Sequence, residues 1–485
     1  MMLSDAGKTS MSPWRGVTGA SAALAVAALC SIAVRARAAD IDWVAVEQQA
    51  TEFLRSYIQI DTSNPPGNET AAATFLAARF HRAGIVAETF EPVPGRASVL
   101  ARVRGSGGLR PVVLLNHLDV VPAQQAEWET PPFSGTLRDG FVYGRGALDC
   151  KGPGTVEAMT LLLLKRHQLK LKRDVIFLGT ADEETGGRLG AGWMAAEHLA
   201  ELGNPEFVLT EGGNIHVLAD GARVYELAAA EKTPCWLKLE ATGASGHGSA
   251  PAPETAVTRL LRALEYLRTY EPPIRVTPEV QTFYAQLAPL QTDERRARYG
   301  DLRAALADPD FRHAFLQNPH DAALVRNTLT PTVLTGSTKT NVIPASASAE
   351  LDCRLLPGEN AEEFIRTVRA TIADPGVAVH VLLNYPAVAS SGDSAVTTAI
   401  GKLAAQEGAS VVTTVLTGFT DSHFFREHGI ASYGFVPFEL TDDETRREHG
   451  VNERLSVRNL RDGTRRLVEL LRLLEEAPVT ERTTP

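Results

Sequence analysis

The sequence predicts an α/β protein into which a second domain is inserted. Before residue 233, short apolar runs alternate with amphipathic helical stretches. This alternation is typical of a sheet that helices cover on both faces. Between residues 233 and 385 the order of strands and helices changes, and the first pattern then returns. A chain of 485 residues is long enough for two such cores.

Composition and net charge indicate which kinds of molecule the protein binds. The chain is 44% hydrophobic and 22% charged, which is ordinary for a globular protein, and its formal net charge is -10. A nucleic-acid binder would need clustered Lys and Arg in excess of the acidic residues. We therefore expect a small-molecule or peptide substrate and no nucleic-acid partner.

The N-terminal segment differs from the rest of the chain. Lys8 and Arg15 precede an apolar run from about residue 17 to residue 34, and Ala-Arg-Ala at 36–38 supplies small residues at cleavage spacing. This pattern predicts a signal peptide over residues 1–38 and a periplasmic or secreted protein. An uncleaved anchor is the alternative, because about 18 apolar residues can just span a bilayer. No other membrane contact is expected.

The cysteines do not have the spacing of a zinc site. Beyond the signal segment the chain contains Cys150, Cys235 and Cys353, without a C-x-x-C pair, so a thiolate zinc site is not expected. Export would permit a disulfide between Cys235 and Cys353. The sequence leaves open whether their geometry allows one.

The elements of the first domain follow in order. An amphipathic helix begins near Val44, a turn-rich break covers residues 61–68, and a second helix covers residues 70–82. The further elements predicted before the insertion are strands at 112–116, 175–179 and 207–210 and helices at 155–167 and 192–202.

The insertion, residues 233–385, has its own set of elements. A mostly polar stretch over residues 278–327 is expected to add helices to it. Its other predicted elements are strands at 235–242, around Leu334, at 347–356 and at 377–383, and helices at 254–267 and 361–372. After it, a helix at 394–406, a strand at 431–436 and a helix at 459–474 complete the first domain, residues 39–232 and 386–485.

Potential metal ligands follow several strands. His117 and Asp119 form an H-x-D motif at a strand end, where the carboxylate can orient the imidazole. Such a motif alone is more often ordinary loop chemistry. Asp149 lies in a glycine-bounded loop before a helix. It could offer its two oxygens to two cations or, alternatively, cap the helix.

Further acids follow the next two strands. Asp182, Glu183 and Glu184 are consecutive, and three neighbouring carboxylates repel one another unless cations or solvent offset their charge. One acid can bind a metal while its neighbour stays free as a base; a solvated acidic turn is the alternative. Glu211 lies at a third strand end, the edge where open α/β sheets bind ligands.

The order of these motifs resembles a known family. H-x-D, L-D-x-K-G, D-E-E-x-G-G and T-E-G-G succeed one another, with DTSNPPGNE before them, WETPPFSG ahead of the L-D-x-K-G loop and HGVNERL near the end. The sequence resembles the co-catalytic dizinc metallopeptidase family of aminoacylase, carboxypeptidases G and S, and succinyl-diaminopimelate desuccinylase. The resemblance covers nearly the whole chain after the signal segment. It implies a mixed-sheet, zinc-exopeptidase-like catalytic domain with an inserted α+β, ferredoxin-like lid and dimerisation domain.

The resemblance assigns roles to these residues. It implies that Asp149 bridges two metal ions, that His117 and Glu211 complete one site, and that Glu184 and His449 complete the other. Zinc is the expected metal, with cobalt or manganese as alternatives. In the same family Glu183 is the general base toward a water activated by the ions. The peptide bond that follows the bridging Asp is cis in the family.

Two histidines are candidates for the last metal-ligand position, because R-E-H-G occurs twice. His428 lies where a helix is predicted to end, and a favourable interaction with the helix carboxyl terminus explains it without a metal. His449 is followed by Asn452 and Glu453, as in the family pattern, and is therefore the preferred ligand.

The resemblance also implies catalytic and substrate-binding roles for residues of the insertion. His247, in GASGHGSAP, is implied to stabilise the oxyanion, often from the partner subunit of a homodimer. A surface-loop His is the alternative. Asn341 and Arg354 resemble positions that grip the carboxylate or carbonyl of the substrate. Arg354 could instead only pair with a neighbouring acid.

The loop GFTD, which contains Gly418 and Thr420, resembles a substrate-facing loop of the family. His423 stands where Arg usually follows the Asp-Ser pair, which weakens close substrate analogy. The expected activity is release of an amino acid from an N-acyl amino acid or short peptide. The alternatives are an amidohydrolase for non-peptide amides such as N-carbamoyl compounds, and a binding protein that keeps the fold without catalysis.

Overall fold

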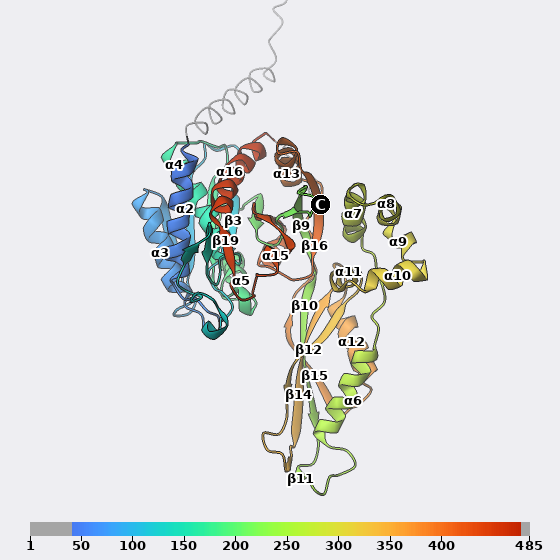
Figure 1. Ribbon diagram of the computed structural model, residues 1–485. Coiled ribbons are helices and arrows are strands. Elements are labelled where there is room, and N and C mark those ends of the chain that lie inside the picture. The colour runs from blue at the N-terminus through green and yellow to red at the C-terminus, as the bar shows by residue number, and fades with distance from the viewer. Residues whose placement is uncertain (1–40, 477–485) are drawn as a thin grey trace, which may run out of the picture. The chain divides into compact units, whose positions relative to one another are not determined.

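The computed structural model describes residues 41–476 of the chain (Figure 1). The predicted signal peptide lies outside these residues. None of the helices within the described range is long and apolar enough to cross a membrane.

A mixed ten-stranded sheet carries the first core. β3 (Val112–His117) runs parallel to both of its neighbours, β6 (Val175–Thr180) and β7 (Phe207–Thr210). The strand order is β1-β2-β6-β3-β7-β17-β9-β8-β18, and β16 pairs with β9. The other strands are β1 (Val86–Phe90), β2 (Ser98–Val103), β8 (Ile215–Val217), β9 (Arg223–Glu231), β16 (Ser410–Leu416), β17 (Ala431–Gly434) and β18 (Glu439–Leu440).

Helices cover both faces of this sheet (Figure 1). Val113 and Leu115 of β3 belong to a buried cluster that includes residues of α5 and α14. On the opposite face, the side chain of Asn116 donates a hydrogen bond to Glu157 of α4 at 2.7 Å. The helices around the sheet are α2 (Trp43–Ile58), α3 (Glu69–Arg82), α4 (Lys151–Arg166), α5 (Ala191–Glu197), α13 (Ala395–Gln406), α14 (Ser422–Glu427), α15 (Asp442–Thr445) and α16 (Val457–Leu474).

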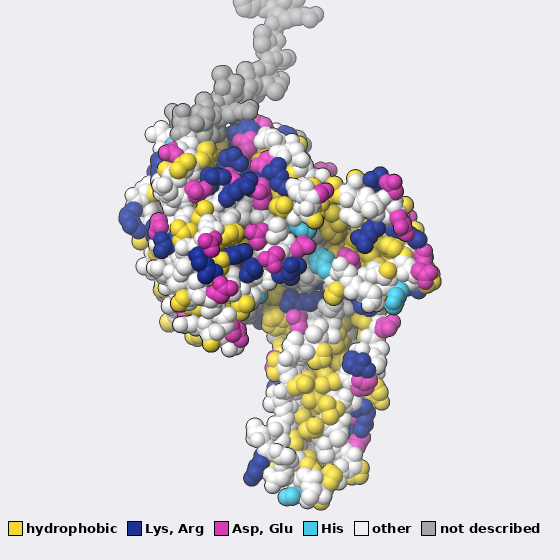
Figure 2. Space-filling model, viewed as in Figure 1, with side chains coloured by type: hydrophobic (Ala, Val, Ile, Leu, Met, Phe, Trp, Pro, Cys, Tyr) yellow, Lys and Arg dark blue, Asp and Glu magenta, His cyan; other side chains and the backbone are white. Residues whose placement is uncertain are grey.

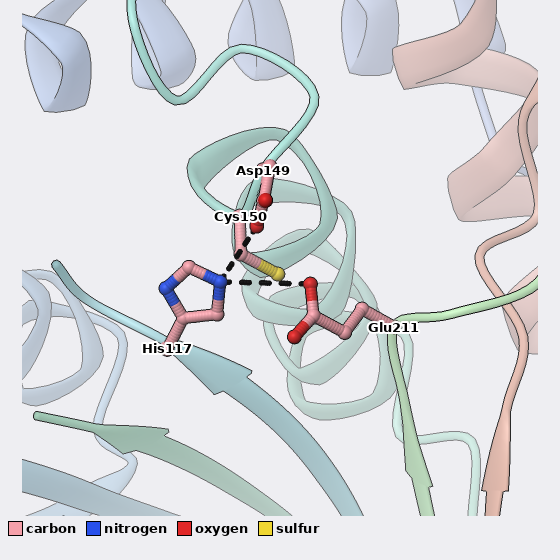
Figure 3. A group of neighbouring side chains, drawn as sticks. All are labelled: His117, Asp149, Cys150 and Glu211. Atoms are coloured by element: carbon pink, nitrogen blue, oxygen red, sulfur yellow. Dashed lines mark hydrogen bonds and ion pairs between the residues drawn. The ribbon is translucent and has the colours of Figure 1, made fainter. Parts of the chain in front are cut away.

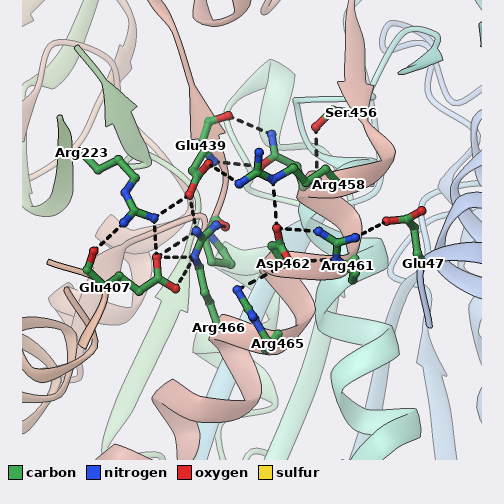
Figure 4. A network of polar contacts seen from close by, with 12 residues as sticks. Glu47, Arg223, Glu407, Glu439, Ser456, Arg458, Arg461, Asp462, Arg465 and Arg466 are labelled. Carbon is green, nitrogen blue, oxygen red and sulfur yellow. Dashed lines mark hydrogen bonds and ion pairs between the residues drawn. The ribbon is translucent and has the colours of Figure 1, made fainter. Parts of the chain in front are cut away.

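An ion-pair network holds α16 against the sheet (Figure 4). The buried Arg466 contacts Glu407, 2.9 Å away, and Glu439. Arg223 of β9 lies 3.1 Å from each of the same two carboxylates. Because all of these groups are paired, the charges that the last helix brings to the sheet are compensated.

The second sheet has four antiparallel strands in the order β12-β14-β10-β15. Its chain order with two helices is β10-α6-β12-β14-α12-β15, which is the βαββαβ arrangement of ferredoxin-like domains. Alternate residues of β10 and β14 pack against the two helices. The elements are β10 (Thr233–Thr242), β12 (Thr328–Thr335), β14 (Ser346–Leu355), β15 (Val377–Asn384), α6 (Ala256–Thr269) and α12 (Ala361–Ile372).

Five further helices lie between α6 and β12 in the chain. They share a core with the large sheet, because Phe283, Tyr284 and Phe315 cluster with Val412 and Val415 of β16. The helices are α7 (Pro278–Leu287), α8 (Asp293–Gly300), α9 (Leu302–Ala305), α10 (Pro309–Leu316) and α11 (Pro319–Leu324). Short sheets are formed by β11 (Gly246–His247) with β13 (Val342–Ile343), and by β4 (Thr136–Arg138), β5 (Phe141–Tyr143) and β19 (Arg454–Ser456).

The mixed α/β class is confirmed, and most predicted elements occur where they were expected. The helix predicted at residues 361–372 has those bounds, whereas α5 ends at Glu197 and not near residue 202. Several strands of the large sheet were not predicted, namely β1, β2, β8, β9, β16 and β18. The boundaries of the catalytic and lid domains remain predictions.

Candidate metal centre

The ring orientation of His117 suits a metal ligand. It is the last residue of β3, and its Nδ1 lies 2.9 Å from the carbonyl oxygen of Asp119. If Nδ1 carries the proton, it donates to this carbonyl and leaves Nε2 free as a donor atom. Nε2 lies 2.6 Å from Asp149 and 3.5 Å from Glu211.

Asp149 directs its two oxygens to two different histidines. Oδ1 faces His117, and Oδ2 lies 2.7 Å from Nε2 of His449. The loop that presents it is held by the buried carboxylate of Glu453, which accepts the backbone N–H of Leu148 at 2.6 Å and that of Asp149 at 3.1 Å. The Asp149–Cys150 peptide bond is cis, as the resemblance implies.

A short 3₁₀ helix, Glu183–Thr185, presents the acidic pair. The buried Asp119 carboxylate accepts the backbone N–H of Glu183 at 3.2 Å and that of Glu184 at 3.1 Å. Asp119 therefore positions both the histidine and the acids. The third acid of the run, Asp182, points elsewhere and pairs with Arg96 at 2.8 Å.

The second histidine lies beside Glu184. Oε1 of Glu184 is buried, has no hydrogen-bond partner among the described residues, and lies 3.4 Å from Nε2 of His449. His428 is not part of this cluster. His428 directly follows α14, and its Nδ1 lies 2.8 Å from the carbonyl oxygen of Phe424 in that helix, in agreement with the explanation that needs no metal.

These side chains form two groups of donor atoms. Within each group, one donor atom from every residue lies within 4.8 Å of the others. The first group is His117, Asp149, Cys150 and Glu211 (Figure 3), and the second is Asp149, Glu184 and His449. Asp149 belongs to both. Imidazole and carboxylate donors around a shared carboxylate fit a pair of divalent cations.

The electrostatics of the cluster fit the same conclusion. Burial, together with the nearby Asp149 carboxylate, raises the pKa of Glu211 to about 7. Burial and the nearby Glu211 raise the pKa of Glu183 well above its usual value. Contacts with Asp149 and Glu184 raise the pKa of His449 to about 11. The crowded acids repel one another and favour protonated histidines, and bound divalent ions would supply the compensating positive charge instead.

Arg354 pairs with an acid and also keeps a free donor. Its Nε and Nη2 bind the Asp352 carboxylate at 2.7 and 3.1 Å, whereas the buried Nη1 has no hydrogen-bond partner among the described residues. The guanidinium lies 5.0 Å from the ring of Phe419 and 5.8 Å from that of Trp236. It therefore lies next to the loop that contains Gly418 and Thr420.

Glu231 shapes that loop. The backbone N–H and Oγ1 of Thr420 both bind its carboxylate, at 3.1 and 3.0 Å, and Arg426 pairs with its other oxygen at 2.8 Å. Gly418 is exposed, and apart from its two chain neighbours no other residue has an atom within 4 Å of the position that a Cβ would take. His423 is buried against Tyr385 and Phe424, and burial lowers its pKa to about 4.

His247 and Asn341 lie together, away from the donor groups. His247 pairs with Val342 between β11 and β13, and the backbone N–H of Gly248 donates to the carbonyl of Asn341 at 2.9 Å. Both residues are exposed. β11 lies beyond the end of β10 farther from the large sheet (Figure 1). The 10 residues of β10 extend about 30 Å.

Two features of the site were not predicted. Cys150 belongs to the first donor group, although its spacing to other cysteines gave no indication of this. The phenol of Tyr385 donates to the carbonyl of Gly186, next to the acidic 3₁₀ helix, at 2.5 Å. The position of Cys150 directly after the bridging Asp was the available signal for the first feature. Nothing in the sequence indicated the second.

The comparisons with known proteins agree with this geometry. Residues 113–473 match the family described as peptidase family M20/M25/M40. The chain is 32% identical over 448 residues to the human N-fatty-acyl-amino acid synthase/hydrolase PM20D1, with 87% of this chain and 86% of the human protein covered. It is 25% identical over 404 residues to pig aminoacylase-1, with coverage of 81% and 88% respectively.

Among solved structures, the M20 family metallo-carboxypeptidase Sso-CP2 from Sulfolobus solfataricus matches with a TM-score of 0.70. The identity is 18%, and the match covers 88% of this chain and 99% of that protein. This likeness shows the fold. Because the family match spans most of the chain and the human relative matches along nearly its full length, the chain belongs to peptidase family M20/M25/M40, a family of metal-dependent hydrolases.

Proposed function

We propose that this hydrolase releases an amino acid from N-acyl amino acids or short peptides. The observation that carries the proposal is the pair of donor groups that share Asp149, with the buried Glu183 beside them. Relatives named as an N-fatty-acyl-amino acid synthase/hydrolase and an aminoacylase support N-acyl amino acids as the substrate class. Long acyl chains are therefore the first to test.

The metal-binding residues and Glu183 have different roles in the proposed hydrolysis. Two divalent cations in the donor groups would polarise the amide carbonyl and activate water for attack. Glu183 has no role in either donor group, so its carboxylate is free to take the proton of the attacking water and deliver it to the leaving nitrogen. Asp119 holds the Glu183 backbone N–H and thereby positions this base.

Zinc is the proposed metal, at both positions. Imidazole and carboxylate donors suit zinc, and cobalt or manganese could replace it. His117 and Glu211 would hold one ion, Glu184 and His449 the other, and Asp149 would contact both. The orphaned Oε1 of Glu184 supports this assignment, since a buried carboxylate oxygen without a partner is costly.

The substrate carboxylate is proposed to bind near Arg354. Its free Nη1 supplies a charge-assisted donor, and the exposed Gly418 leaves room for a ligand close to Thr420. Asn341 and His247 lie together at the two-stranded sheet of β11 and β13, so we propose that they act on the site of a second copy in a homodimer.

Export is proposed from the sequence of residues 1–38. Mass spectrometry of the protein isolated from the periplasm or medium tests it. A mature N-terminus near Ala39 supports cleavage, and an intact N-terminus in the membrane fraction supports an anchor.

An activity screen of the mature protein tests the proposed function. The panel contains N-acyl amino acids with short and long acyl chains, dipeptides and N-carbamoyl amino acids, and bound metals are measured in parallel. We expect release of a free amino acid from the acyl compounds, loss of activity with a chelator, and its return with zinc. Preferred turnover of the N-carbamoyl compounds would favour the alternative hydrolase, and bound metal without turnover would favour a binding protein.

A further inference from the structure

Cys150 occupies an unusual place for a buried cysteine. It directly precedes α4, and its exposed fraction is 0%. The other two described cysteines, Cys235 and Cys353, lie in the core of the four-stranded sheet. Those two are surrounded by apolar side chains, which is the ordinary environment of a buried structural cysteine.

The neighbours of Cys150 are polar and can bind metals. Its sulfur and one donor atom each of His117, Asp149 and Glu211 lie within 4.8 Å of one another. These residues come from the end of β3, the loop before α4 and the end of β7 (Figure 3). The thiol is free and forms no hydrogen bond with any described residue. A buried, unpartnered sulfur therefore faces the same space as three other donor groups.

We propose that Cys150 supplies a sulfur donor to the ion held by His117 and Glu211. This rests on the proposed function as a metal-dependent hydrolase. Coordination replaces the S–H bond by a metal–sulfur bond, and the thiol proton is released as the ion binds. The second group, Asp149, Glu184 and His449, contains only nitrogen and oxygen donors.

The two metal positions therefore differ in chemistry. A thiolate is a soft ligand that favours zinc over manganese or magnesium, whereas a carboxylate and an imidazole accept both kinds of ion. The position with sulfur should keep zinc, and the position of Glu184 and His449 should exchange first when manganese is added. A mixed zinc and manganese enzyme is the expected product of such an exchange.

Optical spectroscopy of the cobalt-loaded full-length enzyme tests the sulfur donor without relying on activity. Metal-free protein is loaded with two equivalents of Co²⁺, and bound cobalt is measured. We expect a sulfur-to-cobalt charge-transfer band in the near ultraviolet, lost in Cys150→Ser and retained in Cys235→Ser. X-ray absorption of the zinc enzyme should then contain a sulfur distance of about 2.3 Å beside the shorter nitrogen and oxygen distances.

The wild-type spectra alone can overturn the proposal, so it does not depend on the folding of a variant. Two bound cobalt ions without the band, and zinc without a sulfur distance, would leave Cys150 as a neighbour of the metal centre and not a ligand. A band that persists in Cys150→Ser would also overturn it. A chain that binds no cobalt at all would overturn the proposed metal centre as well, so the two failures are distinguishable.

Discussion

At the scale of single residues, the two neighbouring acids of the 3₁₀ helix have different environments. Glu184 lies against His449 with an unpartnered oxygen, whereas Glu183 belongs to neither donor group. We expect Glu183→Gln to keep both metals and lose roughly 10²- to 10⁴-fold in kcat, since that is the usual contribution of a general base. Glu184→Gln should lose metal. Turnover and metal content are measured together.

The exposed Glu197→Gln is the control for these variants, because it makes the same change away from the donor groups. Wild-type turnover in Glu183→Gln would refute its role as the base. Full metal content in Glu184→Gln would show that Glu184 is not a metal ligand.

Lys232 gives a pH dependence to stability. It is fully buried, its Nζ donates to the carbonyls of Ala323 and Arg326, and burial lowers its pKa to about 7. The unfolded lysine titrates near 10.4. Between these values the unfolded chain binds the extra proton, so this residue makes stability rise with pH by roughly 1 kcal/mol per unit. Below about pH 7 its burial is fully unfavourable.

Lys232→Met removes this titration. In urea unfolding at about pH 7, 8 and 9, we expect the stability of wild type relative to Lys232→Met to increase with pH. Other groups titrate in both proteins, so their contributions cancel in the difference between the two free energies of unfolding. Parallel pH curves would mean that the lysine keeps an ordinary pKa in the folded chain.

Single residues of the candidate metal centre could be predicted where a motif contains them. His117, Asp149 and Glu211 each lie at a strand end or in a glycine-bounded loop, and the structure brings them together. The contact between Tyr385 and Gly186 joins residues 199 positions apart, and no local pattern marks it. Cysteine spacing did not indicate that Cys150 lies in the first donor group, because such spacing is informative only when the other ligands are cysteines as well.

At the scale of elements, the turn after the 3₁₀ helix is tied to the segment that follows β15. Gly186 has a φ of +110°, and its carbonyl accepts the Tyr385 phenol. Tyr385→Phe removes this bond, whose net contribution is about 1 kcal/mol. If the bond positions Glu183, kcat should fall by roughly five-fold while KM changes less.

Tyr225→Phe is the matched control, because the Tyr225 phenol donates to Glu407 at 2.9 Å and belongs to the network of α16. Its kcat should equal that of wild type. A lower melting temperature in Tyr385→Phe without any change in kcat would limit Tyr385 to a structural role.

Helices were easier to predict than strands. The apolar positions of α12 recur with helical spacing, and Phe364, Ile365, Val368 and Ile372 are its buried residues. β9 was missed because its sequence, RVYELAAAE, contains three consecutive alanines, and alanine favours helices over strands. β16 pairs with it in parallel, and that pairing depends on contacts distant in the sequence.

At the scale of the whole molecule, trans action by His247 predicts complementation. One variant carries Glu183→Gln and keeps His247, and the other carries His247→Ala and keeps Glu183. Each alone should be nearly inactive. In an equal mixture of exchanging homodimers, about a quarter of the wild-type activity should return, because half of the dimers are mixed and each has one complete site.

Turnover is measured after the two proteins have been incubated together, and sedimentation tests whether the protein forms the proposed dimer. A mixture that stays as inactive as its components would mean that His247 does not act on the site of a second copy, and full activity of His247→Ala alone would place His247 outside the catalytic site. A fully active monomer would contradict the trans arrangement directly.

The general architecture could be predicted from the sequence, but the position of one segment could not. The two sheets follow from the alternation of elements and from the family resemblance. The polar stretch at residues 278–327 was expected to belong to the insertion, yet its Phe283, Tyr284 and Phe315 pack with Val412 and Val415 of the large sheet. Such a contact is decided by shape and burial between distant segments, which composition does not encode.

This attachment has a topological consequence. The chain passes between the core of the four-stranded sheet and that of the large sheet at β9 to β10, α6 to α7, α11 to β12 and again after β15. Exchange of a domain between copies is simplest when a single hinge loop swings out. Because several segments connect the four-stranded sheet to the large sheet, opening one loop is not enough to exchange it with the four-stranded sheet of a second copy. In the proposed homodimer, a second copy would therefore add to the surface of the first, and such a dimer could dissociate without unfolding either chain.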